Sequence, residues 1–430
     1  MRRNLAVLIM ILLIVLAGTL QGWVLALSIV QLCLISAIMS LGVNMQWGYA
    51  GIFNVGIVGF AALGGLAAVL VGHEPIAVTI EAGSAGILAA IYRLVVVVVI
   101  MAVIGKYQNG TLRNVLFVIT ALIGFFWVRA VFAPAIGIIE STDAAKTGFL
   151  GGLGMPILLS WIVGGIFAAL AAWGIGKMAL GLRSDYLAIA TLGISEIIVA
   201  IIRNESWLTR GVKNVTKLPR PVPYEIDLQE AAWFVKMCDD WGFDIQAASS
   251  IFVKLCYIGL FSVVLVALFW LMQRAQKSPW GRMMRAIRDN RDAAEAMGKD
   301  VKRRHLQIFV LGSAVIGIAG AMLTTFDGQL IPTAYQPLRF TFLIWVMVIV
   351  GGSGNNWGAI IGGFFIWFFW VEAEKLGPLM MQGITFLIPE GTLKAHLISS
   401  AEQMRLVVMG LILILTLRFA PKGILPEENR

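Results

Sequence analysis

Few side chains in this sequence could carry out chemistry, and those few stand apart from one another. Neither H-E-x-x-H nor G-x-S-x-G occurs, and each Gly-Lys pair is followed by a residue other than Ser or Thr, so the chain lacks a Walker-type phosphate loop of its own. The histidines and cysteines stand singly, without the spacing of a metal site: His73, His305, His396, Cys33, Cys238 and Cys256. The sequence therefore predicts a protein that is not an enzyme and that holds no cofactor or metal.

One acidic side chain, Glu196, lies well inside an apolar run at 186–202. An unpaired carboxylate there costs about 2.5–3.5 kcal/mol on insertion scales, so Glu196 either lines a polar pathway or is paired within a helix bundle. Upstream, Tyr49, Asn54 and several glycines stand at the start of another apolar run. Transporters place substrate sites at glycine-interrupted helices. The candidate pathway residues are therefore Tyr49, Asn54, Thr191 and Glu196.

The stretch from Ser278 to Leu306 is densely charged in an otherwise apolar chain. Between Arg282 and Arg304, eight basic side chains against four acidic ones give a net charge of +4. Apolar residues recur through the stretch at helical spacing, which predicts an amphipathic helix. Ser278 is the expected N-cap, and Gly298 is expected to end or bend the helix. This surface is expected to meet something outside the membrane.

The composition places these segments in a membrane protein. Of 430 residues, 59% are apolar and only 13% are charged, whereas soluble domains carry about 25% charged residues. Apolar runs reach the ~20 residues that cross a bilayer. The net charge of +9 lies mainly beside these runs, which favours membrane orientation and lipid contact over nucleic-acid binding. We expect one all-α, polytopic domain over 1–430 with about 10–12 hydrophobic spans, near 5–20, 23–43, 51–71, 87–104, 115–132, 157–180, 186–202, 251–272, 306–326, 340–371 and 404–419.

Basic residues also predict the orientation of the spans. Placing the N-terminal arginines inside puts the charged stretch at 278–305 inside and the loop 203–250 outside. The run 340–371 is interrupted by a glycine-rich break that starts at Gly351. Treating it as a helix–break–helix hairpin keeps both termini cytoplasmic. Within the span at 306–326, Ser313, Gly317 and Ala321 recur every four residues, which predicts close helix packing.

Several motifs together resemble one family. Asp292-Ala293-Ala294-Glu295-Ala296-Met297-Gly298 resembles the E-A-A-x-x-x-G loop of permease subunits of ABC importers, with Asp in place of Glu. The segments RSDYLAIATLGISEI (183–197), GGSGNNWGAIIGG (351–363) and RFAPKGIL (418–425) are similar to motifs of LivM-type branched-chain amino acid permeases. The likeness covers most of the chain in the expected order. It departs at FNVGIVGFAALGGL (53–66), at 209–214, and at 87–132, which looks like an added pair of hydrophobic segments.

This resemblance implies a subunit of an ATP-driven importer in the bacterial inner membrane. Its partners would be two cytoplasmic ATPases, a second related permease and a periplasmic binding protein that delivers a branched-chain or related amino acid. Urea and amide permeases are similar, so the ligand stays open. The alternatives are a self-contained secondary transporter or channel, or a membrane enzyme. The residues expected to dock on the ATPase are Arg282, Arg285, Asp292, Ala293, Ala294 and Gly298.

Overall fold

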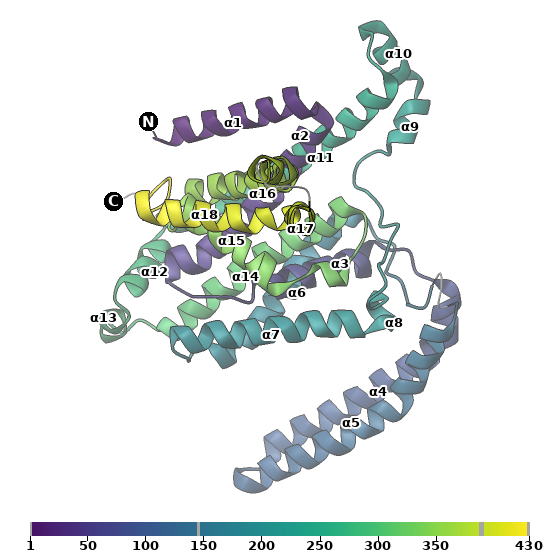
Figure 1. Cartoon of the computed structure of the whole chain (residues 1–430). Helices are drawn as coiled ribbons and strands as arrows, with labels where there is room; N and C mark the ends of the chain where they lie inside the picture. Colours follow the sequence, from purple (N-terminus) through teal and green to yellow (C-terminus); the bar gives the residue numbers. More distant parts are fainter. Residues whose placement is uncertain (1, 144–146, 387–390, 428–430) are drawn as a thin grey trace.

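The computed structural model describes residues 2–143, 147–386 and 391–427, and the chain is mostly helical within these ranges (Figure 1). Within them, nine helices are long and apolar enough to cross a membrane, and two shorter apolar helices accompany them. The all-α, polytopic fold expected from the composition is therefore confirmed. Most of the long helices lie roughly along one common direction, and one pair of long helices diverges from the bundle (Figure 1).

The helices follow the expected order. They are α1 (Arg2–Gln21), α2 (Trp23–Asn44), α3 (Ile57–Gly72), α4 (Ala77–Tyr107), α5 (Gly110–Ser141), α6 (Ile157–Ala179), α7 (Ser184–Asn204), α8 (Ser206–Thr209), α9 (Glu225–Glu230), α10 (Ala232–Trp241), α11 (Ile245–Lys277), α12 (Pro279–Asp289), α13 (Arg291–Ala296), α14 (Val301–Asp327), α15 (Pro337–Gly351), α16 (Asn356–Ile384), α17 (Thr392–Ser399) and α18 (Met404–Phe419). A π-helical turn, η1 (Met45–Tyr49), continues α2.

Small residues hold the centre of the bundle together. α14 packs against α6, α3 and α2, and the predicted close contact through Gly317 is confirmed. A Cβ atom at Gly64 of α3 would lie 2.0 Å from the Gly317 carbonyl oxygen, and one at Gly317 would lie 2.4 Å from that of Gly164 in α6. Only glycine permits three backbones to approach so closely, because any side chain would separate them.

The predicted helix–break–helix hairpin is present as α15 and α16. The break (352–355) contains Gly354, whose φ of +83° suits glycine. Residues 420–427, which we call the C-terminal strap, run along this break. The amides of Ile424 and Leu425 donate to the carbonyls of Val350 and Gly351 at 2.8 and 3.0 Å. The strap, the break and the start of α1 lie at the same end of the bundle as α12 and α13 (Figure 1).

The hairpin of α4 and α5 extends away from the bundle (Figure 1). Its two helices pack mainly on each other, through close contacts such as Gly83 on Ile139 and Gly86 on Ala135. The expected spans at 87–104 and 115–132 thus lie within two longer helices, α4 and α5. The expected span at 51–71 begins later, at Ile57, because residues 51–56 are not helical.

Candidate functional site

The charged stretch forms two helices, so the prediction of one continuous helix is wrong. α12 starts as expected, with the Ser278 hydroxyl accepting the Gly281 amide at 3.3 Å. Asn290 then adopts an extended backbone (φ −152°), and its side-chain oxygen accepts the Ala293 amide at 3.0 Å. Asn290 thereby ends α12 and caps α13, because an asparagine cap satisfies free helix N–H groups. Gly298 follows α13 with φ +75° and ends it as expected.

The apolar face of this stretch is buried against the chain itself. Met284, Ile287 and Val301 are almost fully buried, and Ala294 is buried as well. Around them the surface of α13 is open, and Met297 is 79% exposed. Of the predicted docking residues, those that are exposed are Arg282, Asp292, Ala293 and Gly298, whereas Arg285 is half-buried.

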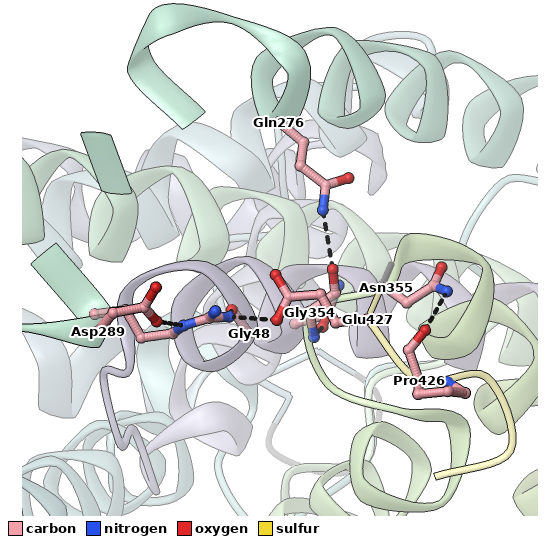
Figure 2. Close-up of polar contacts among 9 residues, drawn as sticks. Gly48, Gln276, Asp289, Gly354, Asn355, Pro426 and Glu427 are labelled. Atoms are coloured by element: carbon pink, nitrogen blue, oxygen red, sulfur yellow. Dashed lines mark hydrogen bonds and ion pairs between the residues drawn. The ribbon is translucent and has the colours of Figure 1, made fainter. Parts of the chain in front are cut away.

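Arg288 connects α12 to the interior, through what we call the Arg288 cluster: Gly48, Arg288, Asp289, Gly354 and Glu427. Its guanidinium pairs with Glu427 of the strap at 3.0 Å and with Asp289 at 3.1 Å, and it donates to the Gly48 carbonyl (Figure 2). Burial lowers the pKa of Arg288, but the two carboxylates raise it by more, so the net direction is upward. The charge on Arg288 is therefore secure, and it ties α12 to η1 and to the strap.

The glycine break completes the cluster. The Gly354 amide donates to Asn44 Oδ1 at 2.8 Å, and its carbonyl accepts from Gln276 Nε2 of α11 at 2.9 Å. Asn355 Nδ2 donates to the Pro426 carbonyl of the strap at 3.1 Å (Figure 2). α2, α11, the break and the strap are thus held together by backbone groups and short polar side chains.

Residues 51–56, which follow η1, are not helical, and we call them the unwound segment. The amide of Val55 donates to Thr191 Oγ1 of α7 at 3.1 Å, and the Val55 carbonyl accepts from Thr341 of α15 at 3.0 Å. The Asn54 side chain donates to Gln46 Oε1 at 2.8 Å and accepts from the Gly56 amide at 2.9 Å. Irregular backbone inside a membrane requires such partners. The segment is therefore an irregular stretch between η1 and α3 that its neighbours hold in place.

The structure separates the four candidate pathway residues. Asn54 and Thr191 both contact the unwound segment, and both are buried. Tyr49 is also buried, and its hydroxyl donates to Asn356 Oδ1 at the start of α16. Glu196 instead lies on the exposed side of α7, away from this buried set.

Sequence reasoning missed the residues that join these parts. It assigned no role to Arg288, Glu427, Gln46 or Asn356, although two of the motifs it used meet in this cluster. The segment 351–363 contains the break, and the segment 418–425 leads into the strap that runs along it. Two motifs without chemistry of their own, each containing Gly or Pro residues where a helix ends, were the available signal for such a contact.

An all-helical, multi-pass fold with an irregular segment held between its helices is typical of membrane transport proteins. Comparison with known proteins places it more closely. The chain belongs to the family described as branched-chain amino acid transport system, permease component, whose pattern matches residues 116–417.

Individual relatives agree with this assignment. The chain is 26% identical to a probable LivM permease of Methanocaldococcus jannaschii over 91% of its own length and 90% of the relative. It is 23% identical to LivM of Escherichia coli, over 61% of this chain and 56% of that protein. A probable LivH permease of M. jannaschii is 31% identical over 27% of this chain and 35% of its own length. No solved structure matches the chain.

Proposed function

We propose that this chain is the permease subunit of an ATP-driven importer, and that it moves branched-chain or related amino acids into the cell. The family and the multi-pass fold support transport, and the names of the LivM relatives support this substrate class. The subunit would lie in the inner membrane with both termini cytoplasmic. The observation that carries the proposal is the Arg288 cluster, which links an exposed helical surface to η1 and the irregular segment that follows it.

The exposed surface of α13 would receive a cytoplasmic ATPase. Asp292 and Ala293 are open to a partner, and the adjoining Met297 offers an apolar contact. A short helix that enters a groove is a common mode of recognition. Displacement of α13 would pull on α12, and Arg288 would pass this motion to η1 and the unwound segment. Two ATPases would act on a pair of permeases in this way.

The exposed face of α7 would receive the second permease, a role that the LivH relative suggests by its name. Glu196 lies on this face among exposed isoleucines such as Ile189 and Ile197. A carboxylate facing hydrocarbon is unfavourable, so a polar cover is required. A pathway between the two permeases would supply it, and Glu196 would attract the ammonium group of the substrate. Asn54 and Thr191 would then shape the wall behind α7.

The opposite end of the molecule would meet a periplasmic binding protein. The segment 203–250 folds into α8, α9 and α10 and lies at the far end from α12 and α13 (Figure 1). Its aromatic residues Trp233 and Trp241 are exposed. Aromatic side chains of this kind are frequent at protein interfaces. Substrate released here would enter the pathway from the outer side.

Reconstituted transport tests the proposal. Vesicles that contain the permease pair and the ATPases are loaded with ATP, and uptake of radiolabelled leucine is measured with the binding protein outside. We expect uptake only when ATP and the ATPases are both present. A matched preparation with ADP in place of ATP is the control. Uptake driven by an ion gradient alone would contradict the proposal and favour a secondary transporter.

A further inference from the structure

A basic cleft lies beside the Arg288 cluster and has no part in the mechanism described above. Its volume is about 230 Å³, and it is bordered by the start of α1, the end of α11, α12 and the glycine break. Gly354 and Gln276 form the wall that it shares with the cluster. The lining residues are Arg3, Gln273, Gln276, Lys277, Arg285, Gly354, Asn355 and Trp357.

The charges of this cleft are of one sign. Arg3, Lys277 and Arg285 come from three different helices, and among the residues that the structure describes no carboxylate lines the cleft. Among the described residues, none of the three cations forms a salt bridge, although Arg3 stacks over the Trp357 ring at 5.3 Å. Bringing like charges together is unfavourable unless an anion joins them. The start of α16, at Asn356, adds the positive end of a helix dipole nearby.

The position of the cleft indicates where the anion comes from. α1, α11 and α16 are membrane-spanning candidates, and the cleft lies where their same-side ends meet. One wall belongs to α1, whose leucines Leu5, Leu8 and Leu12 are exposed along its length. Acyl chains can lie on that apolar surface while a headgroup reaches the cations. The volume is below the ~300–1,000 Å³ of pockets that enclose drug-sized molecules, so a headgroup fits better than a nucleotide.

We propose that this cleft binds a phosphate group carried by an anionic phospholipid of the cytoplasmic leaflet. Basic pockets between spanning helices on this side of a membrane are suited to such headgroups. The bound phosphate joins α1 and α11 to Arg285 of α12, and so restrains the helix that leads to the Arg288 cluster. The assignment to the cytoplasmic leaflet and the effect on transport rest on the proposed function, whereas the binding of the phosphate group itself does not.

Native mass spectrometry of the purified permease, titrated with phosphatidylglycerol, tests the binding. Each cation near the membrane surface contributes about 1 kcal/mol, so Arg3→Gln and Lys277→Gln are each expected to weaken binding about fivefold. Lys277→Arg is expected to retain it. Arg274→Gln is the matched control, because Arg274 lies on the same end of α11 but stacks on Trp270 outside the cleft.

Three results would overturn the proposal. Equal weakening in the Arg274→Gln control would show a general charge effect and no defined site. Equal binding of phosphatidylcholine would show an ordinary lipid contact. Inorganic phosphate that displaces phosphatidylglycerol at comparable concentration would assign the cleft to a soluble anion. Because binding is measured without the ATPases, its failure is distinguishable from a failure of the importer function.

Discussion

At the scale of single residues, Arg288 is the point where surface and interior meet. Its side chain is 24% exposed and forms ion pairs with Glu427, whose side chain is 25% exposed, and with Asp289, whose side chain is 66% exposed. The pair with Glu427 is the better shielded of the two, and screened surface pairs contribute little. Arg288 also donates a hydrogen bond to the Gly48 carbonyl. The loss of one carboxylate therefore weakens the contact of Arg288 with η1 as well as with the strap.

We expect Glu427→Gln to reduce ATP-dependent uptake several-fold and Asp289→Asn to change it little. Glu427→Gln leaves the half-buried Arg288 guanidinium without its shielded carboxylate, at a cost of about 1–3 kcal/mol. Asp289→Asn removes a carboxylate that is largely solvated. Uptake in the reconstituted vesicles and the ATPase rate are measured together. If the variant loses the coupling between ATP hydrolysis and transport, ATP hydrolysis should persist while uptake falls. Equal uptake by the two variants would rule out a role for the strap.

At the scale of elements, the separation of α12 from α13 is the decisive feature. α12 is anchored by its buried face, and α13 presents an open one, with Asn290 between them as a cap. Ala294 is already buried within the permease, so a large substitution there would disturb the anchor as well as a docking surface. Ala293 is the better probe of docking because its side is open.

Loss of the cap should loosen α13 alone. Asn290→Ala removes the acceptor for the Ala293 amide and is expected to cost about 1 kcal/mol of local helix stability. Asn290→Asp keeps the acceptor and serves as the control. Hydrogen exchange of the amides in 291–296 should accelerate in the alanine variant, and affinity for the ATPase should fall about fivefold. Unchanged exchange would mean that the partner, and not Asn290, fixes this helix.

At the scale of the whole molecule, the bundle depends on backbones that touch. The α3, α6 and α14 helices meet at glycines, and the unwound segment is held between α7 and α15. The α4–α5 hairpin contributes little to this centre, because its helices pack mainly on each other. Stability therefore resides in the inner helices, whereas the outer helices carry many exposed apolar side chains.

Substitution at the contact of Gly64, Gly164 and Gly317, which we call the glycine seam, should destabilise the entire bundle. Gly64→Ala places a methyl group 2.0 Å from the Gly317 carbonyl and should lower the thermal midpoint in detergent strongly. Gly174→Ala in α6 meets nothing within 4 Å. This control should be neutral or stabilising by about 0.5–1 kcal/mol, because alanine favours helix. Similar thermal midpoints for the two variants would show that the helices at the glycine seam can move apart without loss of stability.

Local pattern and composition predicted much of this fold. Apolar runs identified the spans, and glycines identified the break after Gly351 and the close contact at Gly317. Pattern could not reveal that Arg288 holds Gly48, because the two residues are 240 positions apart. It also predicted one helix from Ser278, ended or bent at Gly298, since the helical spacing of the apolar residues continues across Asn290. The face of α7 on which Glu196 lies depends on packing against α3, which periodicity alone does not specify.

The C-terminal strap gives the assembly of this protein an order in time. Residues 420–427 leave the ribosome after every helix described here, yet they supply the Glu427 carboxylate and the backbone bonds that run along the glycine break. During synthesis, Arg288 is made before its partner Glu427, and the break is made before the amides of Ile424 and Leu425 that bond beside it. The attachment of α12 to the strap can therefore form only after α18 has been made. A nascent chain that stalls before residue 427 lacks this attachment, so α12 and the proposed docking helix α13 are held less firmly in it.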